Sequence, residues 1–198
     1  MKRFYVQLLL LIILPPVAKA QIASFKNSVR VGIDYLSLDA PDDLGYRFLG
    51  QYARHVANDR IVLEAGLGYL QVENHRRLPN NYIFEGRPRK RITADLTASF
   101  DFIRNQHHAL RLGVGPSVWY REDDLLLRAD YSTQPGGGIT DVKIENRPIN
   151  EVNVGGHVIT EYEYTTRDRI TFGARFGYVN FKAGGISSLL GLTIGYRF

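Results

Sequence analysis

The chain has 198 residues, of which 44% are apolar or aromatic, and it contains no cysteine, which excludes disulfide bonds. Its formal net charge is +5, but three of the basic residues lie in the first 20 positions, and without them the charge is +2. A net charge this small gives no reason to expect nucleic acid as a partner.

The first 20 residues have the three parts of a secretory signal peptide. Two basic residues are followed by an unbroken apolar run over 8–14, and the sequence Ala-Lys-Ala at 18–20 is an A-x-A cleavage site. The apolar run is too short to cross a membrane, which needs about 20 residues. We therefore predict a signal peptide at 1–20 and an exported mature domain at 21–198, without a lipid anchor because no cysteine follows the cleavage site.

Eight segments of the mature chain alternate apolar or aromatic residues with small or polar ones. Successive side chains of a strand point to opposite faces, so each segment has one apolar and one polar face. Leu96 and Thr97, for example, fall on opposite faces of the most regular segment. Strands of about 10 to 13 residues suit a tilted membrane strand and are long for a soluble sandwich. The predicted strands are 28–38, 45–56, 61–73, 91–103, 108–120, 151–164, 169–179 and 186–198.

The mature chain has no segment that is long and apolar enough for a membrane helix. A membrane protein without such helices has to close its strands into a barrel, because only closure satisfies every backbone polar group in lipid. The prediction is an all-β fold, an eight-stranded antiparallel up-and-down transmembrane β-barrel, with the apolar faces toward lipid.

The connections between the predicted strands alternate between short and long. The short set is 57–60, 104–107 and 165–168, and the other set is 39–44, 74–90, 121–150 and 180–185. Outer-membrane barrels have short periplasmic turns and longer extracellular loops. We therefore expect both ends of the mature chain on the periplasmic side, and the segments 74–90 and 121–150 outside the cell.

The chain ends on an alternating strand whose last apolar residues are Tyr196 and Phe198. This ending resembles the insertion signal that the barrel-assembly machinery of bacterial outer membranes recognises. The whole pattern resembles the small OmpA/OmpX/OmpW-type barrels, and the segment Gly113-Val114-Gly115-Pro116 with Trp119-Tyr120 is similar to the outer-membrane β-barrel domain family of Bacteroidetes. The resemblance implies a location in the outer membrane of a Gram-negative bacterium, in contact with its lipid and lipopolysaccharide.

Two residues depart from this pattern. Pro116 lies in a strand that must be paired on both sides, where it removes a ladder hydrogen bond, so we expect a bulge near it. Arg54 falls on the apolar face of its strand, and we expect it at a membrane boundary where its side chain can snorkel to water.

Charged residues recur on the polar faces, which would point into the barrel. They favour either a conducting path or paired charges that fill a narrow bore, and the second interpretation is preferred because eight strands leave room only for side chains. These residues are Arg30, Asp34, Glu64, Asp95, Asp101, Arg111, Glu161, Glu163 and Arg175.

The five histidines do not have the spacing of a metal site. Some small barrels are lipid-modifying enzymes that use a histidine with a serine and an acid. His157 is predicted to point inward and has no evident serine partner in the sequence. We expect no catalytic residue, no metal and no cofactor.

Two extracellular segments are candidate binding regions. The first carries Arg76, Arg77, Arg87, Arg89 and Lys90, a basic set that suits lipopolysaccharide phosphates or simply a solvated loop. The second, 121–150, is a loop of unusual length that contains the apolar run Leu125, Leu126 and Leu127. Such a run needs cover, from the barrel mouth or from a partner protein.

The sequence thus predicts a non-enzymatic barrel with a structural or interaction role, in which the 121–150 loop contacts a partner and the protein can serve as an accessory subunit of a larger outer-membrane complex. The alternatives are a narrow channel for small solutes and, less favoured, an enzyme that modifies lipid A. A barrel fold does not choose among them.

Overall fold

The structure is a computed structural model that describes residues 25–38, 43–77, 83–105, 107–133, 139–182 and 185–198. The predicted signal peptide lies outside this part. Within the described part, no helix has the length and hydropathy needed to span a membrane.

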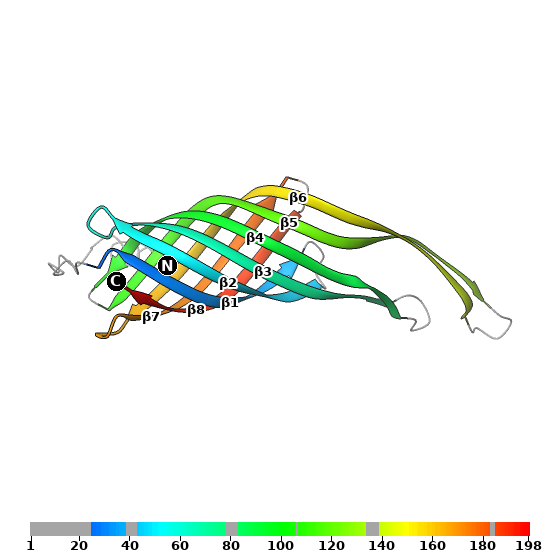
Figure 1. Ribbon diagram of the computed structural model, residues 1–198, viewed down its shortest axis with the longest axis horizontal. Coiled ribbons are helices and arrows are strands. Elements are labelled where there is room, and N and C mark those ends of the chain that lie inside the picture. The colour runs from blue at the N-terminus through cyan, green and yellow to red at the C-terminus, as the bar shows by residue number, and fades with distance from the viewer. Residues whose placement is uncertain (1–24, 39–42, 78–82, 106, 134–138, 183–184) are drawn as a thin grey trace, which may run out of the picture.

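The described residues form a closed antiparallel barrel in which each strand pairs with the next and β1 pairs with β8 (Figure 1). This confirms the predicted fold and strand order. The strands are β1 (Asn27–Leu38), β2 (Asp43–Val56), β3 (Ile61–Arg77), β4 (Ile83–Arg104), β5 (His108–Thr133), β6 (Ile139–Thr165), β7 (Ile170–Phe181) and β8 (Gly185–Arg197).

The barrel is apolar outside and polar inside. Along β7 burial alternates at every residue, so that Phe172 and Tyr178 are 46% and 50% exposed while Thr171 and Arg175 are buried. The same alternation runs through β1 and most of β8. A protein in water would hide these aromatic side chains, so the outward face fits a hydrocarbon environment. The predicted inward and outward faces are confirmed.

The two longest connections were predicted as loops, and this was wrong. β3 and β4 continue as a hairpin to the pair Arg77 and Ile83, and β5 and β6 continue to the pair Thr133 and Ile139. Only the tips, 78–82 and 134–138, lie outside the described residues. Beyond a membrane both faces of a strand meet water, so backbone pairing can continue where the apolar alternation stops. The alternation therefore marked the membrane segments and missed their extensions.

Pro116 does not cause the expected bulge. It pairs in register with Gly156 of β6, and the register between β4 and β5 is the same on both sides of it. Pro116 and Gly115 have no paired residue on β4, so the β4–β5 ladder is interrupted there without a change of register. The bulge between β4 and β5 lies instead between Asp101 and Ile103.

The short turns lie together with the start of β1 and the C-terminus. These are at one end of the barrel, here called the terminal end, and β5 and β6 reach far beyond the opposite end (Figure 1). The turn after β2 is tight, with positive φ at Ala57, Asn58 and Asp59. Arg54 points outward two residues before β2 ends, as predicted, and its place at a membrane boundary stays a prediction.

Candidate functional site: the closed lumen and the β5–β6 arm

Buried ion pairs close the terminal end of the lumen. Arg30 on β1 binds Glu64 and Glu161 and lies 3.3 Å from Glu163 Oε2. Arg111 on β5 bridges the same group, with Nη2 3.0 Å from Glu163 Oε1 and Nε 3.1 Å from Asp101 Oδ1. We call these six residues, Arg30, Glu64, Asp101, Arg111, Glu161 and Glu163, the terminal-end charge cluster. It brings together side chains from β1, β3, β4, β5 and β6, and these side chains are packed inside the bore.

A second cluster lies nearer the middle of the barrel and is centred on Asp34. Arg175 donates from Nε to Asp34 Oδ1 (2.7 Å) and from Nη2 to Oδ2 (2.5 Å), a two-bond arrangement that fixes both planar groups. Arg47 donates from Nε to Asp34 Oδ2 (2.8 Å) and from Nη1 to Asp95 Oδ2 (2.9 Å). All nine inward charges that the alternation predicted lie in these two clusters, and Arg47 is an addition to them.

His157 is held between two hydroxyl groups. Its Nε2 lies 2.8 Å from Thr97 Oγ1, and its Nδ1 lies 2.8 Å from Ser117 Oγ. The prediction that His157 lacks a serine partner was therefore wrong. A catalytic triad would also need an acid on the histidine, but both ring nitrogens already face hydroxyls. Ser117 is fully buried, so a substrate in the membrane cannot reach it.

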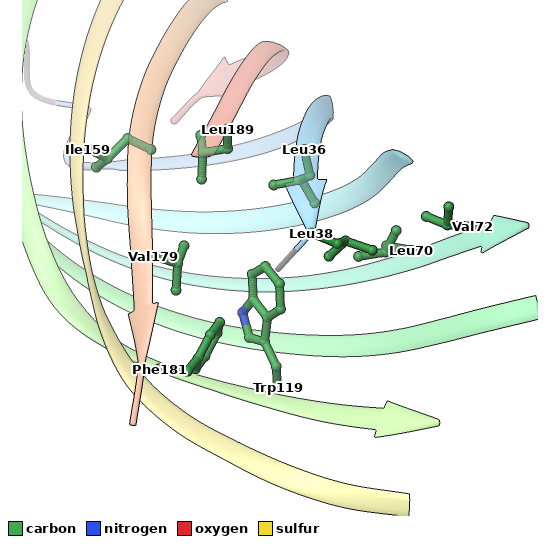
Figure 2. Close-up of a cluster of buried hydrophobic side chains, with 9 residues drawn as sticks. All are labelled: Leu36, Leu38, Leu70, Val72, Trp119, Ile159, Val179, Phe181 and Leu189. Atoms are coloured by element: carbon green, nitrogen blue, oxygen red, sulfur yellow. The ribbon is translucent and has the colours of Figure 1, made fainter. Parts of the chain in front are cut away.

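Apolar side chains fill the lumen at the end opposite the terminal one (Figure 2). Trp119 packs on Phe181 with 4.8 Å between ring centroids, and Arg47 lies 5.6 Å from the Trp119 ring centroid. The Trp119 indole also donates to Asp95 Oδ1 (3.4 Å), which links this group to the central charges. We call it the apolar plug; its members are Leu36, Leu38, Leu70, Val72, Trp119, Ile159, Val179, Phe181 and Leu189.

Between the plug and the terminal-end charge cluster, an interior cavity lies beside Arg47, Glu64, Asp95 and His157. Its volume is about 20 Å³, which is room for one water molecule. Charged groups on one side and apolar groups on the other thus leave no space for a solute at this level. The arrangement matches the predicted filling of a narrow bore by side chains.

Beyond the plug, β5 and β6 continue as a two-stranded ribbon, here called the arm (residues 122–133 and 139–150). Its base is tied to β4 by an ionic group around Asp123, which lies 3.3 Å from both Arg89 and Arg91 and 3.1 Å from Arg121. Farther out the register shifts between Leu126 and Arg128, so Leu127 is an extra residue in β5 and is 53% exposed.

The structure distributes the predicted binding residues unevenly. Arg76, Arg77 and Arg87 lie on the β3–β4 hairpin, and Leu125 and Leu126 lie on the arm, but the side chains of these five are outside the described part.

The other predicted residues can be placed by their side chains. Arg89 is buried against Asp123, which leaves its side chain little access to an outside ligand, whereas Lys90 is half-buried. Tyr196 and Phe198 both point outward and are 47% exposed, as an aromatic girdle requires. Their role in assembly, and the lipopolysaccharide contact, stay predictions.

Two features of the lumen were not predicted, Arg47 and the Ser117–His157 contact, although the first could have been. Arg47 lies between outward Tyr46 and Phe48, so the alternation did mark it as inward. The contact of Ser117 with His157 depends on the register of β5 and β6, where Gly115 faces His157 and Gly155 faces Ser117. Serine and histidine therefore meet diagonally across the two strands, and no local pattern gives that register.

No protein-family model matches the chain, and no curated protein matches it in sequence. The structure is similar to a major outer membrane protein from Thermus thermophilus, with a TM-score of 0.57 and 12% identity over 89% of this chain and all of that one. It is also similar to Neisserial surface protein A (TM-score 0.53, 15% identity, 89% of this chain and 98% of that one). A third similar structure is Ail, the attachment invasion locus protein of Yersinia pestis (TM-score 0.53, 14% identity, 89% and 100%).

At these identities the likeness shows the fold alone, which is that of the small eight-stranded outer-membrane barrels. The predicted resemblance to OmpA/OmpX/OmpW-type barrels is confirmed at that level. The more specific resemblance to the Bacteroidetes family gains no support from sequence comparison.

Proposed function

We propose that this protein is a non-enzymatic barrel of a Gram-negative outer membrane that binds a partner protein through the arm. The apolar outward face and the outer-membrane proteins that share the fold support the location. The observation that carries the role is the arm itself, because it extends the structure far beyond the barrel it is built on (Figure 1).

Each strand of the arm has an open edge that is not paired with a third strand in the described part of the chain. β4 pairs with β5 as far as Glu122, and β7 pairs with β6 as far as Gly155. Past these residues no third strand joins the ribbon in the described part of the chain. An isolated two-stranded ribbon is only marginally stable in water, and an open strand edge is a ready template for another strand. A partner that adds a strand to either edge would order the arm and bind by main-chain hydrogen bonds.

The composition of the arm indicates the chemistry of such a partner. Residues 122–150 contain six acidic and three basic side chains. Asp123 is already paired with arginines at the base of the arm, and the remaining five acidic and three basic side chains favour a partner strand with basic groups. Leu127 adds an exposed apolar contact at the position where the register shifts. The leucines at 125 and 126 extend the apolar run along the chain. This combination suits a protein surface with a basic strand and an apolar pocket.

The two alternatives have less support. A channel needs an open path, but ion pairs and the apolar plug fill the lumen on either side of a cavity that holds one water molecule. A lipid-A-modifying enzyme needs a nucleophile that reaches the membrane, and Ser117 is buried inside. Planar-bilayer conductance and mass spectrometry of lipid A test these alternatives directly.

The partner is tested by shortening the arm. Replacing residues 126–146 with Asn-Gly leaves Leu125 and Arg147 joined by a two-residue hairpin turn, which suits their observed pairing. The matched control replaces residues 77–83 with Asn-Gly and so shortens the β3–β4 hairpin instead. A narrower variant changes Leu125, Leu126 and Leu127 to serine.

All three variants should remain heat-modifiable on a gel, because the barrel segments are unchanged. The wild type and the β3–β4 control should copurify with a partner in mild detergent, and the two arm variants should lose it. A partner that stays bound to the shortened arm, or a wild type that purifies alone and conducts ions, would contradict the proposal.

A further inference from the structure

The outward face of the barrel has an apolar hollow that the arm does not explain. It has a volume of about 930 Å³ and spans β1, β2, β3, β7 and β8. Gly50 lies in it, and a Cβ atom added there would meet no atom within 4 Å. Val31 and Leu67 pair with Gly50 from the two neighbouring strands, and Phe48 is the next outward residue along β2. Gly50 therefore leaves open space within a hollow that is otherwise lined by bulky side chains.

Arg54 is the one basic residue on the outward, apolar face of β2. It lies on the terminal-end side of Gly50. Gly50, Tyr52 and Arg54 point outward in succession. With a rise of ~3.4 Å per residue and a strand tilt of ~40°, Arg54 lies ~10 Å from Gly50 along the barrel axis. This distance is a little less than half the height of an apolar band ~25 Å tall. A hydrocarbon chain in the hollow would thus begin near Arg54.

The surface between Arg54 and the hollow leaves a lane for such a chain. Tyr52 stands between them, but its hydroxyl donates to Asn27 Oδ1 on the β1 side (2.8 Å). On the other side, the residue that pairs with Tyr52 is the small Ala65 of β3. The lane from Arg54 to Gly50 therefore runs over Ala65.

Other basic side chains lie on the same rim of the barrel as Arg54. Lys26 and Arg60 are both exposed at the terminal end. The acidic residue of the adjoining turn, Asp59, is buried and lies 3.2 Å from Arg197 Nη2, so its charge is already matched. Guanidinium and ammonium groups at such a boundary attract phosphate, and arginine binds it with directed, charge-assisted hydrogen bonds.

We propose that the hollow and Arg54 together form a binding site for one phospholipid of the periplasmic leaflet. The phosphate lies at Arg54, and an acyl chain passes over Ala65 into the hollow at Gly50. The periplasmic leaflet follows from the short turns at this end, which face the periplasm in outer-membrane barrels. The site rests on the outer-membrane location proposed above and is independent of the arm.

The test measures phospholipid retention by native mass spectrometry of the purified barrel mixed with phosphatidylglycerol in detergent. Gly50→Leu fills the hollow, and Arg54→Gln removes the phosphate ligand. Each should weaken retention of one lipid about tenfold, the change expected from losing one charge-assisted hydrogen bond or the burial of a few methylene groups. Each has a matched control. Ala94→Leu adds the same side chain in the same outward row, outside the hollow, and Arg167→Gln removes an arginine from the same rim at the β6–β7 turn.

Loss of one retained lipid in the two site variants, with both controls like the wild type, would support the site. Equal retention in all five proteins, an equal loss in all four variants, or a dimer in place of the lipid adduct would overturn it. Failure of the membrane location is a separate result: the wild type would then be missing from outer-membrane fractions. A wild type that is folded, located in the outer membrane and free of retained lipid would refute the lipid site alone.

Discussion

Arg30→Met is expected to destabilise the barrel strongly. Arg30 is 1% exposed and binds three carboxylates, those of Glu64, Glu161 and Glu163. Methionine has a similar length but no charge, so the four carboxylates of the terminal-end charge cluster would face Arg111 alone. Removing one partner from a buried ionic group costs about 3–5 kcal/mol, because the remaining charges are desolvated without compensation.

Urea unfolding of the barrel in lipid vesicles measures this cost, and Trp119, the single tryptophan of the chain, reports on it by fluorescence. The control is Arg128→Met. Arg128 also forms an ion pair, with Nε 2.7 Å from Asp130 Oδ1, but its side chain is 69% exposed, so the cost should stay below about 1 kcal/mol. Adding Glu161→Gln to Arg30→Met should recover part of the loss. If Arg30→Met is within about 1 kcal/mol of the wild type, the cluster does not hold the lumen closed as described.

Three further results are expected. Leu96→Arg should cost about 2–4 kcal/mol of unfolding free energy if Leu96 lies near the bilayer midplane. A spin label at Leu96 should report lipid and one at Thr97 should not, and equal lipid exposure at both positions would refute the barrel orientation. Deleting Phe198 should deplete the protein from the outer membrane in fractionation, and a normal folded yield would exclude a role for Phe198 in assembly. Gly115→Ala should lower the free energy of unfolding by about 1–3 kcal/mol in the same urea assay, because the new Cβ would meet the Leu96 carbonyl oxygen at 1.7 Å. An unchanged midpoint would show that β4 and β5 separate easily there.

The membrane part of the fold could be predicted because lipid imposes a period of two on every spanning strand. Leu96 and Thr97 were assigned to the correct faces from that period alone, and so were the inward charges. The short turns were located to within about a residue, since they mark where the alternation breaks on the terminal side.

The remainder depended on information that the local sequence does not carry. The arm continues past the alternating membrane segments, so Leu125 and Leu126 follow no alternation although they are paired with β6. The contact between Ser117 and His157 follows from strand register, which the whole barrel sets. The same is true of the hollow at Gly50, which exists only when the neighbouring strands place bulky residues around it.

The central claim, that the arm binds a partner, is tested most directly by photo-crosslinking in living cells. A photoreactive residue at the exposed Leu127 should give one discrete adduct with another protein, and the same residue at outward-facing Leu96, within the barrel, should give adducts with lipid only. No protein adduct from Leu127, together with ion conductance of the purified barrel, would contradict the account and favour a channel.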